Sequence, residues 1–568
     1  MKNNLNGLGK AIFTKYTQLI YIDMSSCNIS AIDKSAFEKL THLTELNLFD
    51  NPMKTFQGNI FAPLDELKVL HISHDLLSTY PRDSWSDVSN LTKVFTYGGP
   101  SNGSFAEIFS VMQNLKFFNS DYKHNMLHNC TFSAFKSTPL EYLSIVGRLW
   151  AIAIHAFSPL RVLSSLIIPN QDYLILSNTL PALHVFENRQ MDELDLSNNF
   201  RHYGEYVITT DLLAFIGNIC VRKISLTGNG IRLIDAAALQ KMKYKHCLEN
   251  LNLNNNDFDY HQAWLIVDFN LFTNLRRIDF SSINGRFTNN IPIQKRYSKR
   301  CTLDHLDKSL VPIQTCNMED IVIRFPSSLE FINASLIHSH TSSINSITFK
   351  GIKTLKMFDL TYSSFYDCNY YFHGLQNVRV LNMSHFKCSV LNPEFLRSGL
   401  NLEQLIMQSS SLSIGLKDDH HSIFLHGLKR LQYIDFSRNA FEDRFRISTF
   451  KSQLDSLQSL ILEGNLFTSI PLNLNYFNRL SLLNLRNNKM AYLTTQEIDA
   501  LEVLFEKSNR TMTVLLEGNP LVCSFASLDF VEWLFTTKVK FDTMVVIRVS
   551  KTMAILHQQM QFTITCEL

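Results

Sequence analysis

The chain has 568 residues, of which 45% are hydrophobic and 18% are charged, and its formal net charge is +2. This composition provides ample apolar material for a core and excludes a disordered chain. The small net charge also argues against a protein whose whole surface binds nucleic acid, because such proteins usually carry a larger excess of Lys and Arg.

The chain opens in the middle of a repeating pattern. Asn3, Leu5 and Leu8 already have the spacing that the later repeats show. Asn3 and Lys10 also interrupt the apolar run that an export signal would need. Because the core of a repeat array needs a cap over its first coil, we expect residues 1–18 to be a partial repeat whose N-terminal cap is missing, with further sequence upstream.

Residues 19–512 repeat the pattern LxxLxLxxNxL, with the first two copies 24 residues apart. The alternating apolar residues predict a short strand whose large side chains enter a core. The asparagine at the strand end predicts side-chain hydrogen bonds to the backbone of adjacent turns. Five copies of the pattern are Leu43, Leu46, Leu48, Asn51, Met53; Leu67, Leu70, Ile72, Asp75, Leu77; Leu248, Leu251, Leu253, Asn256, Phe258; Leu457, Leu460, Leu462, Asn465, Phe467; and Leu480, Leu483, Leu485, Asn488, Met490.

These repeats predict an α/β solenoid, a leucine-rich-repeat horseshoe with a long parallel concave sheet and an irregular convex side. At about 24 residues a coil, the length corresponds to about twenty coils. Phe37 and Phe61 lie ten residues after a strand end and are expected to fill the convex side. Residues 91–190 lose most of the asparagines, and we expect an irregular insert near residues 281–343.

A basic run lies within this insert, at Lys295, Arg296, Lys299 and Arg300. Three interpretations of it remain open. The run is a solvated loop, a contact for an acidic ligand such as nucleic acid, or a dibasic processing site.

Residues 513–568 are expected to form a C-terminal cap that closes the solenoid. Its motif contains Asn519, Pro520, Leu521, Val522 and Cys523, followed by Phe530, Trp533 and Leu534. This motif resembles the cysteine-flanked cap of extracellular leucine-rich-repeat proteins. Together with the irregular 24-residue coils, it makes nearly the whole chain resemble the ectodomain of a Toll-like receptor. Both vertebrate and invertebrate members of that family remain open.

The resemblance implies recognition of a microbial or endogenous ligand, ligand-promoted dimerisation, and signalling through a cytoplasmic Toll/interleukin receptor domain that is absent from this chain. It implies a place on the extracellular or lumenal side of a cell-surface or endosomal membrane. A receptor fragment, an isolated ectodomain and a soluble decoy remain open. In the family the first cysteine of the cap pairs with the third, and here Phe525 replaces the second, so the resemblance implies a changed pairing of Cys523 with Cys566.

The ten cysteines suit an oxidising compartment. Cys301 and Cys316 bracket part of the insert, and Cys220 and Cys247 lie one coil apart just ahead of successive strands, so both pairs are candidate disulfides. The remaining cysteines are divided between expected structural thiols, Cys27 and Cys388, and positions with no evident partner, Cys130 and Cys368.

Seven Asn-x-Ser/Thr triplets are candidate glycosylation sites. They begin at Asn28, Asn90, Asn102, Asn129, Asn333, Asn382 and Asn509.

The sequence predicts a binding protein and no enzyme. Asp418, Asp419, His420 and His421 include metal-ligand residue types, but adjacent loop residues rarely converge on one ion, so we expect a polar connection between coils and no metal or cofactor. No stretch has the roughly 18 apolar residues of a membrane span. The leading hypothesis is a ligand-binding receptor ectodomain in innate immunity with a protein or microbial-pattern ligand. The alternative is a secreted or cell-surface adhesion or matrix protein, and the terminal cysteine motif disfavours a cytosolic sensor.

Overall fold

The computed structural model describes residues 6–257 apart from positions 101, 172, 200–205 and 235, and then residues 271–281, 320–334, 338–339, 346–361, 364–365, 371–386, 392, 394–416, 419, 421–523, 525–542 and 548–549. The chain divides into two compact units, Met1–Phe258 and Asp259–Leu568. Among the described residues, no helix is long and apolar enough to cross a membrane.

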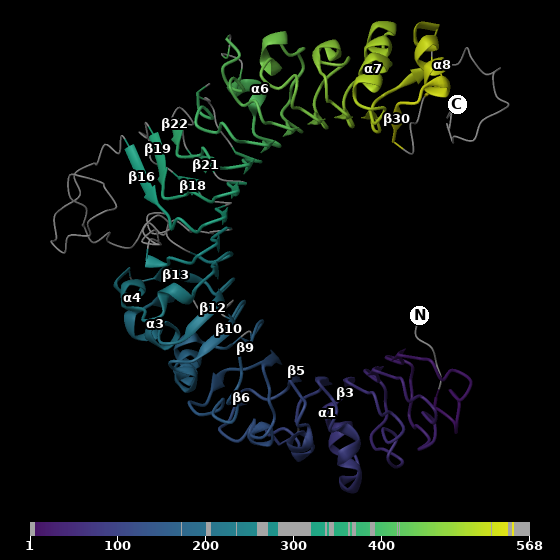
Figure 1. The fold of residues 1–568 in the computed structure, drawn as a ribbon, viewed down its shortest axis with the longest axis vertical. Helices are drawn as coiled ribbons and strands as arrows, with labels where there is room; N and C mark the ends of the chain where they lie inside the picture. Colours follow the sequence, from purple (N-terminus) through teal and green to yellow (C-terminus); the bar gives the residue numbers. More distant parts are fainter. Residues whose placement is uncertain are drawn as a thin grey trace. The chain divides into compact units, whose positions relative to one another are not determined.

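The first unit is a stack of coils, and each coil contributes one short strand to a parallel sheet (Figure 1). Pairing keeps one register along the stack, so that Glu45, Val69 and Lys93 occupy equivalent positions in successive strands. The strands are β1 (Tyr21–Asp23), β2 (Glu45–Asn47), β3 (Val69–Ser73), β4 (Lys93–Tyr97), β5 (Phe117–Tyr122), β7 (Tyr142–Gly147), β9 (Ser165–Ile167), β10 (Gln190–Asp195), β12 (Cys220–Ser225) and β14 (Asn250–Asn252).

Short helices and small strand pairs form the other side of the first unit (Figure 1). The strand pairs are β6 (Met126–Leu127) with β8 (Ala151–Ile152), and β11 (Tyr206–Ile208) with β13 (Ile231–Ile234). The α-helices are α1 (His74–Ser78), α2 (Leu176–Thr179), α3 (Thr210–Gly217) and α4 (Ala236–Lys241), and the 3-10 helices are η1 (Arg82–Val88), η2 (Glu107–Val111), η3 (Ser133–Phe135), η4 (Leu180–Phe186) and η5 (Lys245–Cys247).

The second unit repeats this plan. Its parallel strands are β15 (Arg277–Asp279), β17 (Phe331–Asn333), β20 (Met357–Asp359), β23 (Val380–Asn382), β24 (Gln404–Ile406), β25 (Tyr433–Asp435), β26 (Ser459–Ile461), β27 (Leu482–Asn484), β28 (Thr513–Leu515) and β30 (Lys540–Phe541). Together the described parts of the two units contribute twenty strands of this kind. The α/β leucine-rich-repeat solenoid predicted from the sequence is confirmed.

Smaller elements complete the second unit. The strands are β16 (Asp320–Arg324), β19 (Ser346–Lys350) and β22 (Tyr371–His373) in one sheet, β18 (His338–Ser339) with β21 (Ser364–Phe365), and β29 (Val522–Cys523) with β31 (Arg548–Val549). The helices are α6 (Leu412–Gly415), α7 (Thr495–Lys507), α8 (Leu528–Thr536), η7 (Ile447–Phe450), η8 (Leu474–Tyr476) and η9 (Phe525–Ser527).

The core of each coil follows from the alternation of apolar residues. Leu46 and Leu70 are fully buried on neighbouring strands, while the residues on either side of each are only partly covered. Phe37 and Phe61 are 0% and 1% exposed, as predicted for residues that fill the side opposite the strands. Full burial of such a side chain stabilises the fold by about 1.5–3 kcal/mol.

A ladder of buried amides joins the coils. The Asn465 side chain accepts hydrogen bonds from the backbone N–H groups of Asn439 and Phe441, and it donates to the carbonyl oxygens of Phe436 and Leu462. Asn51 makes the same kind of bonds in the first unit. The predicted role of the strand-end asparagine is therefore confirmed in both units.

The interpretation of Asp75 as a ladder residue is wrong. Asp75 lies in the first turn of α1, and its side chain is 59% exposed. The Ser73 hydroxyl accepts a hydrogen bond from the backbone N–H of Leu76 and so caps a helix at this point. Because serine at the N-cap favours a helix, the chain leaves the repeat geometry one residue before the expected ladder position.

The last described coils end in two helices. The Thr494 side chain and Glu497 form a capping box at the start of α7. Trp533 of α8 donates its indole N–H to the Glu502 carboxylate of α7 at 2.6 Å. Beyond α8, the Asp542 carboxylate is only 1% exposed and faces Arg486 at 2.8 Å. The C-terminal cap itself stays a prediction, because Cys566 lies outside the described residues.

Candidate ligand-binding face

Five aromatic rings form a continuous strip on the face of the first unit's sheet that points away from the apolar core. One ring comes from each of five successive coils, and each ring is half-buried. The residues of this aromatic strip are Phe49, His71, Phe95, Phe117 and Tyr142. Outward strand positions in a solvated sheet normally carry polar residues, so this row needs an explanation beyond folding.

Neighbouring rings of the strip contact one another. Phe49 meets His71 edge-on with 5.4 Å between ring centroids, and His71 lies parallel to Phe95 at 4.3 Å. Phe95 is tilted against Phe117 at 5.0 Å, and Phe117 stacks on Tyr142 at 4.3 Å. Aromatic pairs contribute about 0.5–1.5 kcal/mol beyond their burial, so these contacts hold the strip in one conformation before any ligand arrives.

The strand register makes the strip diagonal. His71 and Phe95 occupy equivalent positions on β3 and β4, whereas Phe117 and Tyr142 are aligned with Lys93, two residues earlier. Diagonal neighbours in a sheet are close enough for aromatic side chains to meet. The strip therefore crosses the strands and can contact a ligand that spans several coils.

Polar groups line the first end of the strip. The Nε2 atom of His71 lies 3.1 Å from Oε1 of Glu45. Tyr97 is 50% exposed and lies 6.3 Å from Phe49 between ring centroids. The ammonium group of Lys123 lies 5.9 Å from the centre of the Tyr97 ring, in a cation–π contact.

Carboxylates lie near the other end. Burial raises the pKa of the Tyr142 hydroxyl, and the negative charges of Glu193 and Asp195 raise it further. The Asp195 carboxylate also stabilises the turn after β10, because it accepts a hydrogen bond from the backbone N–H of Ser197 at 2.9 Å. Glu193 is half-buried and lies next to Ser165 of β9 in the register.

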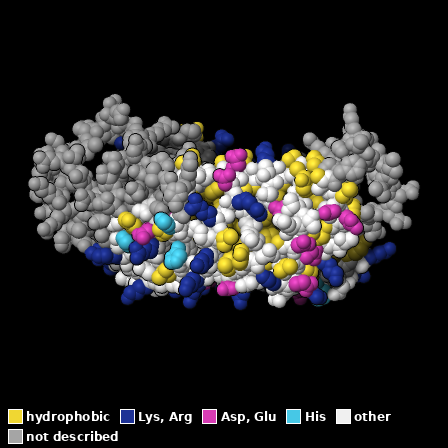
Figure 2. Space-filling model, turned by 90° about the horizontal axis from the view of Figure 1, so that it is seen from above, with side chains coloured by type: hydrophobic (Ala, Val, Ile, Leu, Met, Phe, Trp, Pro, Cys, Tyr) yellow, Lys and Arg dark blue, Asp and Glu magenta, His cyan; other side chains and the backbone are white. Residues whose placement is uncertain are grey.

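The aligned outward positions from β1 to β10 carry a net negative charge. Five of them carry carboxylates and one carries an amine, which gives these aligned positions a formal charge of −4. The carboxylates are Asp23, Glu45, Asp121, Glu193 and Asp195, and the amine is Lys93. By contrast, on the face seen in Figure 2, Lys and Arg side chains are interspersed with Asp and Glu, and hydrophobic side chains are scattered among them.

The strands of the second unit carry a polar row instead. The Asn333 amide donates to Asp279 at 3.1 Å, and the Asn382 amide donates to Asp359 at 3.3 Å. These bonds join neighbouring strands β15 and β17, and β20 and β23.

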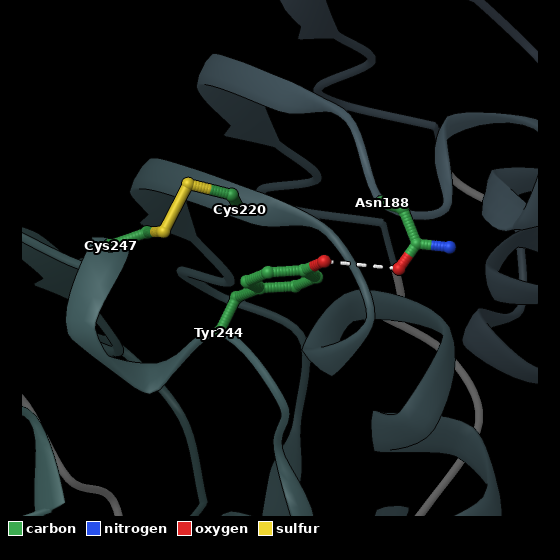
Figure 3. Close-up of a disulfide and its surroundings, with 4 residues drawn as sticks. All are labelled: Asn188, Cys220, Tyr244 and Cys247. Atoms are coloured by element: carbon green, nitrogen blue, oxygen red, sulfur yellow. Dashed lines mark hydrogen bonds between the residues drawn. A yellow bond between two sulfur atoms is a disulfide. The ribbon is translucent and has the colours of Figure 1, made fainter.

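Of the three cysteine pairs considered from the sequence, the structure brings together Cys220 and Cys247 in a disulfide (Figure 3). The bond links the start of β12 to the end of η5. Beside it, the Tyr244 hydroxyl donates to the Asn188 side chain at 3.0 Å (Figure 3). The disulfide therefore joins two consecutive coils close to this hydrogen bond.

The other cysteines are only partly described. Cys27 is a buried free thiol, as expected, and Cys130 is an exposed free thiol that accepts a hydrogen bond from the Ser104 hydroxyl at 3.2 Å. The expected bridges of Cys301 with Cys316 and of Cys523 with Cys566 lie outside what the structure describes, as do Cys368 and Cys388.

The candidate glycosylation residues fall into two groups. Five are exposed: Asn28, Asn90, Asn102, Asn129 and Asn509. The other two, Asn333 and Asn382, end strands β17 and β23 and use their amide nitrogens in the polar row. None of the seven lies on an outward strand position of the first unit's described sheet.

The remaining candidate groups do not form a described site. The basic run Lys295, Arg296, Lys299 and Arg300 lies outside the described residues, as do Asp418 and His420. Asp419 accepts hydrogen bonds from the backbone N–H groups of Ile423 and Phe424 at 2.7 and 3.0 Å, which makes it part of a turn, and the side chain of His421 is exposed. Within the described residues, no group of three or more His, Cys, Asp or Glu side chains is placed to hold a metal ion.

Comparisons with known proteins find relatives built from leucine-rich repeats. The Leucine rich repeat family model matches residues 1–53, and the BspA type Leucine rich repeat region model matches residues 128–256. Toll-like receptor 8 of Homo sapiens is 31% identical over 146 residues, which are 25% of this chain, and the CD180 antigen of Mus musculus is 22% identical over 233 residues, which are 41% of it. The chain is a leucine-rich-repeat protein similar to Toll-like receptor ectodomains.

The chain matches only part of each relative. The match covers 13% of the length of Toll-like receptor 8 and 33% of the length of the CD180 antigen. Among solved structures, it is similar to mouse RP105 in its complex with MD-1, with a TM-score of 0.47 and 14% identity over 95% of this chain and 90% of that chain. It is also similar to TLR13 in its complex with ssRNA13, with a TM-score of 0.35 and 15% identity over the same shares.

The sequence alone did not single out the aromatic strip. A signal was nevertheless present, because an aromatic residue stands directly before the buried apolar residue of two successive strands, as Phe117 before Phe118 and Tyr142 before Leu143. In a strand, one member of each such pair must face outward.

Proposed function

We propose that this chain is the ligand-binding ectodomain of a Toll-like pattern-recognition receptor in innate immunity. The observation that carries the proposal is the aromatic strip, a preformed row of rings across five coils of a rigid sheet. A contiguous row of half-exposed rings on a solvated face commonly marks a binding site. A rigid site also reduces the entropy lost when a ligand binds.

The location of the candidate glycosylation residues supports this assignment. The strip and the strands around it carry none of them, whereas Asn28, Asn90, Asn102 and Asn129 are exposed elsewhere in the same unit. Because a glycan is bulky and hydrated, glycans at these four positions would leave the aromatic strip accessible.

The receptor role extends to partners and location. We propose that a protein or microbial-pattern ligand promotes homodimerisation, and that a cytoplasmic Toll/interleukin receptor domain outside this chain transmits the signal. We place the chain on the extracellular or lumenal side of a cell-surface or endosomal membrane. The disulfide and the five exposed acceptor asparagines suit such an oxidising, glycosylating compartment.

A signalling chimera tests the function. The chain is fused to a membrane span and a Toll/interleukin receptor domain in cells that carry a transcriptional reporter, and the cells are exposed to a panel of microbial preparations. We expect at least one preparation to activate the reporter. The double variant Phe95→Ser/Phe117→Ser should lose at least nine-tenths of that response, and the control Trp150→Ser should keep it, since Trp150 is 54% exposed outside the sheet strands.

Silence of the parent chimera with every preparation, despite surface expression, would contradict the receptor assignment. A chain of this fold that binds cells or matrix without activating the reporter would instead be an adhesion or matrix protein.

Enzymatic deglycosylation tests the location. We expect the secreted chain to lose mass on treatment, with glycans at the five exposed asparagines and none at Asn333 or Asn382, whose amides are hydrogen-bonded. A chain without any glycan after passage through the secretory pathway would oppose this placement.

A further inference from the structure

We propose that the aromatic strip binds an extended polypeptide segment with aliphatic side chains at its centre and lysine or arginine near both ends. This inference rests on the proposed function, because it assigns a ligand class to the same face. Three features of the described sheet support it: the arrangement of the rings, the sign of the charge, and the distance between the charged ends.

The rings offer edges to a ligand more than faces. His71 lies parallel to Phe95 with an interplanar angle of 0°, and Phe117 lies on Tyr142 with an angle of 7°. Proteins that hold single-stranded nucleic acid stack successive bases on free aromatic faces. In the strip, the two stacked pairs cover one face each of His71, Phe95, Phe117 and Tyr142, so aliphatic side chains fit the remaining surface better than bases do.

The negative charge around the strip disfavours the binding of a polyanion such as nucleic acid. The aligned outward positions around the strip carry five carboxylates and one amine. A nucleic acid carries a phosphate for each nucleotide and depends on Lys and Arg contacts for affinity. A segment with basic ends instead meets charges of the opposite sign.

Four of the five carboxylates lie toward the two ends of the strip, and the fifth, Asp121, lies on β5 with Phe117. Asp23 and Glu45 lie on β1 and β2, at the Phe49 end. Glu193 and Asp195 lie on β10, two strands beyond Tyr142. The centre of the face holds Lys93, which is aligned with Phe117 and offsets the charge of Asp121. Lys123 lies over the Tyr97 ring near Phe49 and offsets one of the two carboxylates at that end. An apolar centre with basic ends therefore matches the face along its length.

The span sets the length of the segment. The sheet places six strand intervals between Glu45 and Glu193, through β3, β4, β5, β7 and β9. At about 4.8 Å for each interval, the span is about 29 Å. An extended chain advances about 3.3 Å per residue, so about nine residues cover it.

Equilibrium binding to the intact chain tests the proposal. The probes are three fluorescent molecules: the peptide KKLSLSLKK, its charge-reversed counterpart EELSLSLEE, and a single-stranded thymidine 20-mer. Fluorescence anisotropy gives a Kd for each probe at two salt concentrations. We expect KKLSLSLKK to bind at least tenfold more tightly than EELSLSLEE and more tightly than the oligonucleotide, with weaker binding at high salt.

Two variant pairs locate the contact. Phe95→Ser/Phe117→Ser should weaken KKLSLSLKK binding at least tenfold, whereas Trp150→Ser should leave it unchanged. Glu45→Gln/Glu193→Gln should weaken it about threefold and reduce its salt dependence. The matched control Glu66→Gln/Glu107→Gln removes two exposed carboxylates outside the strands and should have no effect. Thermal unfolding of every variant separates loss of binding from loss of fold.

Three outcomes would overturn the inference: no peptide binding up to millimolar concentration, peptide binding that ignores the strip variants, or tighter strip-dependent binding of the oligonucleotide. The chimera result remains separate. A reporter that responds while the peptide fails to bind overturns the ligand class and leaves the receptor function standing. Strip-dependent peptide binding with a silent reporter supports the ligand class and contradicts the receptor function.

Discussion

The imidazole ring of His71 lies parallel to the phenyl ring of Phe95, with 4.3 Å between their centroids, on neighbouring strands of the first unit. On its other side, Phe49 meets His71 edge-on at 5.4 Å. His71 is thus enclosed between two rings on a face that points away from the apolar core. This arrangement makes the aromatic strip a structural unit as well as a candidate binding site.

The His71 and Phe95 contact should be measurable as a coupling energy. We expect a double-mutant cycle with His71→Ala and Phe95→Ala to give a coupling of about 1 kcal/mol in the free energy of unfolding. Urea denaturation of the parent, both single variants and the double variant measures it. Strictly additive effects would show that the rings lie near each other without stabilising the strip.

Removing one asparagine of the amide ladder should destabilise the fold. We expect Asn465→Ala to lower the free energy of unfolding by about 3 kcal/mol, because it leaves the N–H groups of Asn439 and Phe441 and the carbonyl groups of Phe436 and Leu462 without this partner. The control Asn475→Ala, at an exposed position, should cost less than about 0.5 kcal/mol. Equal effects of the two changes in urea denaturation would contradict the ladder's role.

The disulfide should stabilise the coils that it joins. Cys220 and Cys247 are 27 residues apart. Closing a loop of this length restricts the unfolded chain and corresponds to about 3.5 kcal/mol in the chain-entropy model. We expect Cys220→Ser/Cys247→Ser to lose an amount of this order, measured by denaturation, and to become insensitive to reductant in that transition. An equally stable double variant would exclude this contribution.

His74 should make the first unit sensitive to acid. Burial lowers the pKa of His74 in the folded chain, although Asp75 partly opposes this effect. The ring is 5% exposed, and its Nε2 atom accepts a hydrogen bond from the backbone N–H of Ala106 at 3.3 Å. The unfolded chain therefore binds the proton more tightly, so this contribution to stability is present above about pH 6.5 and is lost as the pH falls below it.

The variant His74→Gln tests this dependence, because the glutamine oxygen can replace the Nε2 acceptor without titrating. We expect the Tm of the parent to fall more steeply between pH 7.5 and pH 5 than that of His74→Gln. The control His42→Gln, at a side chain that is 51% exposed, should retain the parent's slope. Parallel pH profiles for the parent and His74→Gln would contradict the prediction.

The repeat was predictable because every coil needs the same hydrogen bonds for its buried backbone groups. Backbone groups at the strand ends must be hydrogen-bonded once they are buried, and asparagines at one spacing, such as Asn51 and Asn465, meet that demand in both units. Asp75 failed as a prediction because a single local preference, the serine cap at Ser73, starts a helix there. Pattern spacing alone does not include such competing local bonds.

The aromatic strip could not be predicted with the same certainty, because outward and inward phenylalanines look alike in a short strand. Phe118 is fully buried, whereas its neighbour Phe117 belongs to the strip. Only the register of five strands, from β2 to β7, shows that the outward rings meet. Sequence order also gave no indication that the carboxylates of Glu45 and Glu193 lie toward opposite ends of that row.

The affinity of KKLSLSLKK for the parent chain and for Phe95→Ser/Phe117→Ser tests the central claim most directly. The account predicts a Kd at least tenfold higher for the double variant, with Trp150→Ser matching the parent. Equal Kd values for the parent and a folded Phe95→Ser/Phe117→Ser would contradict the claim that the aromatic strip is the ligand-binding face.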